Sequence, residues 1–157
     1  MKFSSRKFFF VRHGESLWNM QNLCQGREDI DLSPRGIEDA KAFAENLVQL
    51  PIQYICTSPL KRALHTADLI KQYHPKAGFA VVAELAERDW GCLAGMPSRS
   101  MYEIEALEEK NPNYPLDPSI ESRKDLQERV VCGLHKAFQF HEEPLLVSHG
   151  RLFEALS

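Results

Sequence analysis

The chain has 157 residues, of which 43% are hydrophobic and 26% charged, and its formal net charge is −3. This composition is typical of a globular protein, so it excludes a disordered or fibrous chain, and the length predicts a single domain over residues 1–157. Proteins that bind nucleic acid through their overall charge are usually basic, so the acidic balance predicts no nucleic-acid partner.

The N-terminus carries basic residues and then a short apolar run, Phe8–Val11. A signal peptide needs roughly 7–15 apolar residues and a membrane helix about 18, so we expect neither a signal peptide nor a membrane partner. The cysteines lie far apart in the sequence and form no Cys-x-x-Cys pair: Cys24, Cys56, Cys92 and Cys132. This spacing favours reduced thiols in a cytoplasmic protein over a disulfide framework or a zinc site.

The first half of the chain alternates predicted strands and helices. The continuous apolar run Phe8–Val11 predicts a strand buried on both faces, as in parallel sheets. Ser33 and Pro34 predict a helix start, with Ser33 as the N-cap and proline at the first helical position. Apolar residues then recur at helical spacing until Pro51, and residues 54–57 predict a second short strand.

The same alternation continues to the end of the chain. A second helix is expected from Ser58-Pro59 until just before Pro75, followed by a strand over 79–82. A later helix over 121–140 and a strand over 145–148 complete the pattern. We therefore predict an α/β fold with a mainly parallel sheet flanked by helices on both faces.

Residues 96–119 depart from this alternation. The segment contains four prolines and a short acidic helix over 102–110. Such a composition is typical of a surface excursion within one domain rather than a linker between two.

Polar residues follow each of the four predicted strands, within 12–15, 58–62, 84–88 and 148–151. In open α/β sheets, ligands bind beyond the carboxyl ends of the strands, so these residues are expected to meet at one edge. Two histidines, several arginines and a carboxylate would then converge. Arginine forks match phosphate oxygens and a neutral imidazole can attack phosphorus, so the pattern predicts a phosphate site.

Five motifs in this order resemble those of the histidine phosphatase superfamily, which has the phosphoglycerate-mutase-like fold. They are Val11-Arg12-His13-Gly14-Glu15-Ser16, Trp18-Asn19 with Gln25-Gly26 and Asp31-Leu32-Ser33-Pro34-Arg35-Gly36, Ser58-Pro59-Leu60-Lys61-Arg62-Ala63, Leu85-Ala86-Glu87-Arg88-Asp89-Trp90-Gly91, and Val147-Ser148-His149-Gly150. The resemblance covers almost the whole chain.

The resemblance implies a role for each catalytic candidate. His13 would be the nucleophile that forms a phosphohistidine, with its other ring N–H held by a backbone carbonyl. Arg12 and Arg62 would bind the phosphoryl oxygens. His149 would donate a hydrogen bond to the transferring group and supply positive charge. Glu87 would be the general acid and then the base, with a raised pKa.

Further residues are implied as ligands to the substrate. Asn19, Gln25 and Gly26 would lie on the phosphate side of the site, together with Arg12, Arg62 and His149. Glu84 is the rival of Glu87 as the acid, although the position in the motif favours Glu87. No cluster of ligand residues has metal-binding spacing, so neither a metal nor another cofactor is expected.

Two departures from the family pattern bear on these expectations. The family commonly has Gly-Gly-Glu-Ser after the excursion, where this chain has Ser119-Ile120-Glu121-Ser122. The chain also stops at Ser157, eight residues past His149, where the family usually continues through a further helix and strand. We therefore expect either a truncated product or a sheet that lacks an edge strand. The missing edge would lower stability or lead to self-association into a homo-oligomer.

The favoured function is a phosphatase acting on a small phosphorylated substrate, and two alternatives remain. A phosphoglycerate mutase must hold a carboxylate-bearing intermediate, but residues 96–119 offer only Arg99 and Lys110 as extra cations. A truncated, non-catalytic member that binds a phosphorylated ligand is the second alternative.

Overall fold

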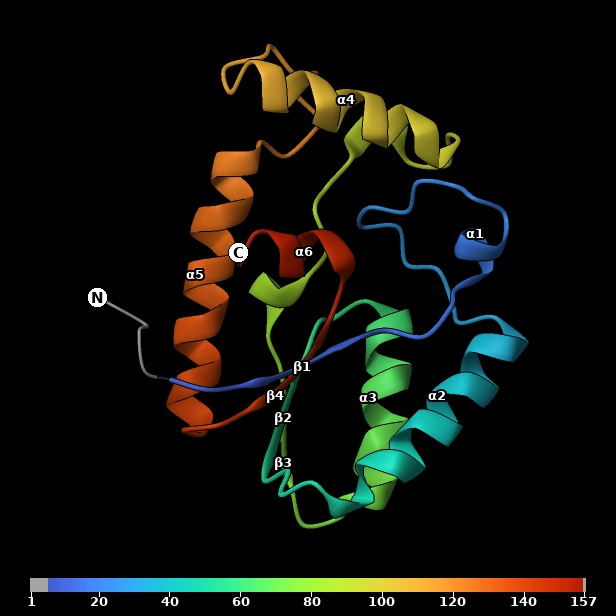
Figure 1. Ribbon diagram of the computed structural model, residues 1–157, viewed down its shortest axis with the longest axis vertical. Helices are drawn as coiled ribbons and strands as arrows, with labels where there is room; N and C mark the ends of the chain where they lie inside the picture. The colour runs from blue at the N-terminus through green and yellow to red at the C-terminus, as the bar shows by residue number, and fades with distance from the viewer. Residues whose placement is uncertain (1–5, 157) are drawn as a thin grey trace.

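The computed structural model describes residues 6–156 and shows a four-stranded, wholly parallel sheet (Figure 1). Its strands are β1 (Phe9–Arg12), β2 (Tyr54–Thr57), β3 (Gly78–Val81) and β4 (Leu145–Ser148), in the order β1-β4-β2-β3. The predicted α/β fold is thus confirmed, and the strand order, which the sequence did not predict, places β4 and β2 inside the sheet and β1 and β3 at its edges. The expectation about a signal peptide concerned in part residues 1–5, which lie outside the described residues.

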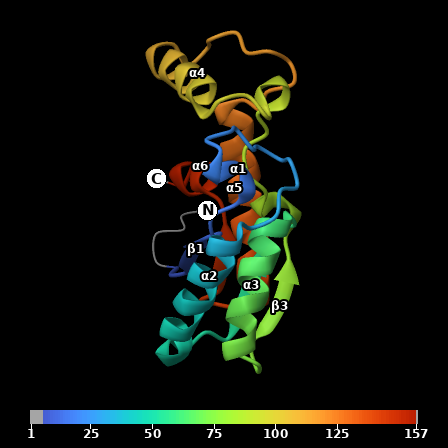
Figure 2. The ribbon, with the colours of Figure 1, turned by 90° about the vertical axis from the view of Figure 1, so that its right-hand side faces the viewer.

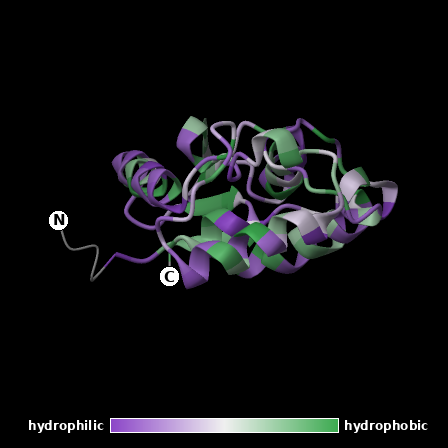
Figure 3. Ribbon diagram, turned by 90° about the horizontal axis from the view of Figure 1, so that it is seen from above, coloured by the Kyte–Doolittle hydropathy of each residue, from purple (hydrophilic) through white to green (hydrophobic). Residues whose placement is uncertain are grey.

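Six α-helices occur in the described part of the chain. They are α1 (Leu17–Met20), α2 (Pro34–Asn46), α3 (Lys61–Tyr73), α4 (Ser98–Lys110), α5 (Arg123–Phe140) and α6 (Gly150–Glu154). Short 3₁₀ turns lie at Leu47–Gln49, Ala83–Leu85 and Gly91–Leu93. Hydrophilic and hydrophobic residues are mixed along the helical ribbons, as amphipathic helices require (Figure 3).

The strands bury side chains on both faces, and this produces two cores. Ile55, Leu145 and Val147 point to one side, where α2 and α3 cover the sheet. Cys56 and Leu146, their immediate neighbours in sequence, point to the other side, where α5 and α6 pack. This alternation follows from the two-residue period of a strand, and it confirms helices on both faces.

The helix starts show which local signals decide the structure. At α2, the Ser33 hydroxyl accepts a hydrogen bond from the Gly36 N–H at 2.9 Å, and Pro34 is the first helical residue, as predicted. The prediction that the next helix starts at Ser58-Pro59 is wrong, because α3 starts at Lys61. The Ser58 hydroxyl does accept from a backbone N–H, that of Leu60 at 3.2 Å, but this bond stabilises a turn that precedes the helix.

Helix α4 lies at one end of the elongated molecule, beyond the carboxyl ends of the strands (Figure 2). It begins at Ser98, four residues before the predicted start. A third, small core of Cys24, Trp90 and Ile120 lies beneath this region. A buried ion pair between Arg88 and Glu108, with nitrogen–oxygen distances of 2.8 and 2.9 Å, ties α4 to the loop that follows β3. Over residues 6–156, no helix combines the length and the apolar character that a membrane crossing requires.

Candidate active site

The carboxyl ends of the strands surround a cavity of about 170 Å³. Its wall contains seven of the eight residues expected at the site: Arg12, His13, Asn19, Gln25, Gly26, Arg62 and Glu87. The eighth, His149, is completely buried, and its ring centroid lies 5.0 Å from that of His13. The structure therefore brings the predicted residues together from segments far apart in the sequence.

The His13 ring is held in one tautomer by its neighbours. Its Nδ1 lies 2.6 Å from the Gly14 carbonyl oxygen, so Nδ1–H donates there. The Nε2 atom accepts a hydrogen bond from Nε of Arg62 at 3.3 Å and therefore carries a lone pair. Burial, together with the positive charge of Arg62, lowers the pKa of His13 from 6.5 to about 3. The imidazole is consequently neutral and its Nε2 is a potential nucleophile.

This lowered pKa predicts a measurable loss of stability in acid. Between pH 8 and pH 5 the unfolded chain takes up a proton on His13, whose ordinary pKa is 6.5, whereas the folded protein, with a pKa of about 3, does not. The wild type should therefore lose about 2 kcal/mol more free energy of unfolding than His13→Asn over this range. Urea unfolding of both proteins at the two pH values measures the difference. An identical loss in both would show that His13 titrates normally when folded.

Arg62 is fixed in place by backbone carbonyls. Its two terminal nitrogens donate to the carbonyl oxygens of Gly26 and Glu28 at 2.8 and 2.7 Å, and the side chain is 1% exposed. Burial lowers the pKa of Arg62 to about 10, so the guanidinium stays protonated at neutral pH. Gly26 adopts φ +52°, and a Cβ there would lie 3.0 Å from the Trp90 nitrogen, so this turn favours glycine.

His149 is buried and uncharged in the structure. Its Nε2 lies 2.7 Å from the Ser58 hydroxyl, and its Nδ1 is buried without a hydrogen-bond partner. Burial, then the proximity of His13 and Arg62, lowers the pKa of His149 well below its usual value. The ring is therefore neutral at pH 7 without a ligand, and its positive charge beside a bound phosphate stays a prediction. A phosphate dianion beside the two rings would raise both pKa values.

The Glu87 carboxylate lies at the start of α6. It accepts hydrogen bonds from the backbone N–H groups of Arg88, Leu152 and Arg151 at 2.8, 3.2 and 3.3 Å. Burial raises the pKa of Glu87, and the hydrogen bonds from Arg88 and Arg151 offset this only in part. Glu84, the rival candidate, forms an ion pair with Lys136 and does not line the cavity.

The loop that carries Glu87 is held from α5. The Arg129 guanidinium donates to the carbonyl oxygens of Glu84, Ala86 and Glu87 at 2.7, 2.8 and 3.2 Å. It also forms two hydrogen bonds, of 2.7 and 2.9 Å, with the carboxylate of Glu121. Glu121 belongs to the segment 119–122, which departs from the family pattern. Through its hydrogen bonds to Arg129, Glu121 nevertheless supports the loop that carries Glu87. Sequence reasoning missed Arg129 because nothing in its helical position indicates the loop it reaches.

Two carboxamides in the cavity wall are oriented by one serine. The Ser16 backbone N–H and hydroxyl both donate to Oδ1 of Asn19 at 3.0 Å, and the hydroxyl also lies within hydrogen-bond distance of Oε1 of Gln25. With these oxygens engaged, the NH₂ groups of Asn19 and Gln25 are the donors available to a ligand.

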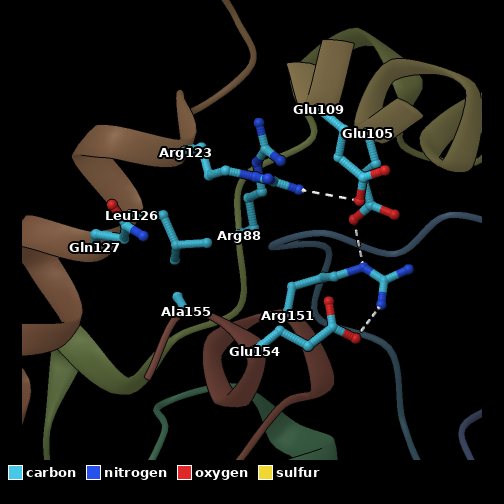
Figure 4. A pocket seen from close by; sticks show the side chains of 9 residues that line it. All are labelled: Arg88, Glu105, Glu109, Arg123, Leu126, Gln127, Arg151, Glu154 and Ala155. Atoms are coloured by element: carbon cyan, nitrogen blue, oxygen red, sulfur yellow. Dashed lines mark hydrogen bonds and ion pairs between the residues drawn. The ribbon is translucent and has the colours of Figure 1, made fainter. Parts of the chain in front are cut away.

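The outer part of the cavity contains residues that sequence reasoning did not include. Met101 and Tyr102 come from α4, and Arg151 and Glu154 come from α6. Figure 4 shows a neighbouring pocket that Arg151 and Glu154 also line. There Arg151 lies between the carboxylates of Glu154 and Glu105, and Glu105 does not line the active-site cavity. Because the α4 residues lie in the proline-rich excursion, only the three-dimensional arrangement places them over the strand ends.

Comparison with known proteins assigns the class. The family described as "Histidine phosphatase superfamily (branch 1)" matches residues 8–157, and this chain belongs to it. The chain is 37% identical over 150 residues to the "Uncharacterized phosphatase PhoE" of Bacillus subtilis (strain 168), covering 93% of this chain and 72% of that protein. It is 34% identical over 170 residues to the 2,3-bisphosphoglycerate-dependent phosphoglycerate mutase of Nitrobacter hamburgensis, covering 98% of this chain and 80% of that protein.

Solved structures agree with this assignment. A mycobacterial glucosyl-3-phosphoglycerate phosphatase in complex with VO3 superimposes with a TM-score of 0.81 at 25% identity, over 97% of this chain and 78% of that chain. Bacillus stearothermophilus YhfR has a TM-score of 0.81 at 24% identity, over 95% of this chain and 76% of that chain, which shows the shared fold.

Proposed function

We propose that this protein is a phosphatase that hydrolyses a small phosphomonoester through a phosphohistidine on His13. The observation that carries the proposal is the His13 ring itself. Its Nδ1 is tied to the Gly14 carbonyl, and its unprotonated Nε2 faces the Arg62 guanidinium in the cavity wall. A nucleophilic nitrogen beside a fixed cation is the arrangement that attack on a phosphoryl group needs. Membership of the histidine phosphatase superfamily supports the same reading.

In the first step, the Nε2 lone pair of His13 attacks phosphorus and the P–O bond to the alcohol breaks. Glu87, whose pKa burial raises, transfers its proton to the leaving oxygen, so that a neutral alcohol departs. Arg12 and Arg62 bind the equatorial phosphoryl oxygens and stabilise the charge that develops there. The product of this step is an N–P bond on His13.

In the second step, water attacks the phosphorus of the phosphohistidine. The Glu87 carboxylate accepts a proton from that water as the N–P bond breaks. Inorganic phosphate leaves, and the lone pair returns to Nε2 of His13. The ring of His149 lies beside that of His13 and donates a hydrogen bond to the phosphoryl group in both steps. The Ser58 hydroxyl positions the His149 ring.

The pKa shifts predict an asymmetric pH profile for kcat/KM with an alkyl phosphate. His13, with a pKa of about 3, should cause no loss between pH 7 and pH 5, because it stays unprotonated throughout. Activity should fall on the alkaline side as Glu87, with its raised pKa, loses its proton. Glu87→Gln should remove this alkaline limb on the same substrate. An alkaline limb of unchanged position in Glu87→Gln would mean that another group titrates.

A phosphoglycerate mutase remains the alternative function, because mutases occur among the relatives at 34% identity. The two cations of the excursion, Arg99 and Lys110, are exposed on α4 and do not line this cavity, and the further cation that does line it, Arg151, is paired with carboxylates. Incubation with 3-phosphoglycerate and a trace of 2,3-bisphosphoglycerate, which would phosphorylate the histidine of a mutase, separates the two functions. The phosphatase releases inorganic phosphate, whereas a mutase produces 2-phosphoglycerate, detectable by phosphorus NMR, without net release.

A further inference from the structure

The outer part of the active-site cavity has a charge balance unlike that of its floor. At the floor, Arg12 and Arg62 face the position of the phosphoryl group. At the outer wall, the cation is Arg151, and it contacts two carboxylates: Glu154, which also lines the cavity, and Glu105, which lies behind the wall in a neighbouring pocket. Its guanidinium lies 2.5 Å from a Glu105 oxygen and 2.6 Å from a Glu154 oxygen (Figure 4).

The position of Arg151 is also fixed by an aromatic ring. Its guanidinium carbon lies 5.3 Å from the ring centroid of Tyr102, within the range of a cation–π contact. Both Arg151 and Tyr102 line the cavity. The side chains of Arg151 and Glu105 are only 20% and 15% exposed, so this ion pair is less screened by solvent than a surface pair. The positive charge of Arg151 is therefore neutralised by its carboxylate partners before any ligand binds.

We propose that this wall makes the enzyme selective for phosphomonoesters whose alcohol portion is polar and carries no negative charge. The inference rests on the proposed phosphatase function, because it assigns the outer wall to the leaving alcohol. Arg151 and Glu154 balance one another in the wall, and Glu105 behind it brings the group of three side chains to one net negative charge, so Arg151 offers no free positive charge to a ligand. A carboxylate or second phosphate on the alcohol would meet like charge there, and Arg151 would have to leave its partners in order to bind it.

Two substrates with the same carbon skeleton test this selectivity. Glycerol 3-phosphate carries a hydroxymethyl group where 3-phosphoglycerate carries a carboxylate. The wild type should prefer glycerol 3-phosphate in kcat/KM by about tenfold or more. Burial raises the pKa of Glu105, so the comparison is made at pH 8, where its ionisation is favoured.

Variants that each remove one charged side chain then test the role of the wall. The measured quantity is the ratio of kcat/KM for the two substrates. Glu105→Gln removes one carboxylate from Arg151 and should shift the ratio toward 3-phosphoglycerate by roughly three- to tenfold. Glu109→Gln is the matched control, because Glu109 lies one turn further along α4 and pairs with Arg123 at 3.8 Å. Arg151→Gln should shift the ratio in the opposite direction, which a general loss of structure would not do.

The outcomes separate this inference from the proposed function. Equal or better hydrolysis of 3-phosphoglycerate by the wild type would overturn the selectivity, as would a ratio that Glu105→Gln and Glu109→Gln change alike. Hydrolysis of 4-nitrophenyl phosphate in either case would leave the phosphatase function standing. If none of the three compounds is hydrolysed, the proposed function itself fails, and the inference fails with it.

Discussion

Replacing His13 with alanine should reduce the hydrolysis of 4-nitrophenyl phosphate by roughly a thousandfold or more. The variant lacks the Nε2 lone pair that attacks phosphorus and that lies beside the Arg62 guanidinium. Because His13 is 7% exposed and its ring touches that of His149, thermal unfolding should be measured in parallel. Steady-state release of 4-nitrophenol measures the effect.

His65→Ala is the matched control for this experiment. His65 is exposed on α3, so its loss removes an imidazole without touching the cavity, and activity should be retained. The wild-type assay should also keep its rate in the presence of a chelator, because no step in the mechanism needs a metal. Full activity in His13→Ala would contradict the mechanism, and a rate lost to the chelator and restored by a divalent metal would contradict its independence of metals.

Glu87→Gln should slow alkyl phosphates far more than aryl phosphates. An alkoxide leaves poorly without a proton from an acid, whereas a phenolate leaves with little help, so the loss should be about 100-fold or more for glycerol 3-phosphate and much smaller for 4-nitrophenyl phosphate. Glutamine retains oxygen and shape, so the contacts to the α6 N–H groups are preserved in part. The ratio of kcat/KM for the two substrates is the measurement.

Glu84→Gln provides the control for the role of Glu87. Glu84 lies three residues earlier in the same segment, but its side chain pairs with Lys136 away from the cavity. It should leave the alkyl-to-aryl ratio unchanged. Equal slowing of both substrate classes in Glu87→Gln would indicate a binding role for Glu87, and a changed ratio in Glu84→Gln would identify Glu84 as the acid.

The sequence predicted the features that depend on neighbouring residues or on the shared edge at which parallel strands end. The Ser33-Pro34 cap forms because its hydrogen bond is made within four residues. The convergence of the segments at Arg12, Arg62, Glu87 and His149 follows because parallel strands end at one edge of the sheet, and this was confirmed.

Features that depend on long-range packing could not be predicted. The turn after β2 delays α3 to Lys61. Arg129 of α5 contacts the loop that carries Glu87, and Arg151 of α6 contacts Glu105 of α4. The residues next to Arg129 and Arg151 in the sequence indicate neither contact. The neutrality of His149 arises from complete burial, which its motif does not reveal.

The covalent intermediate is the central claim, and chemical trapping tests it most directly. The wild type is mixed with 4-nitrophenyl phosphate that carries radioactive phosphorus, and the reaction is quenched in alkali within milliseconds. The labelled peptide is then identified by mass spectrometry. We predict a phosphoryl group on the peptide that contains His13, stable in alkali, lost in acid and absent from His13→Ala. No label during active turnover, or a label on another residue, would contradict the mechanism.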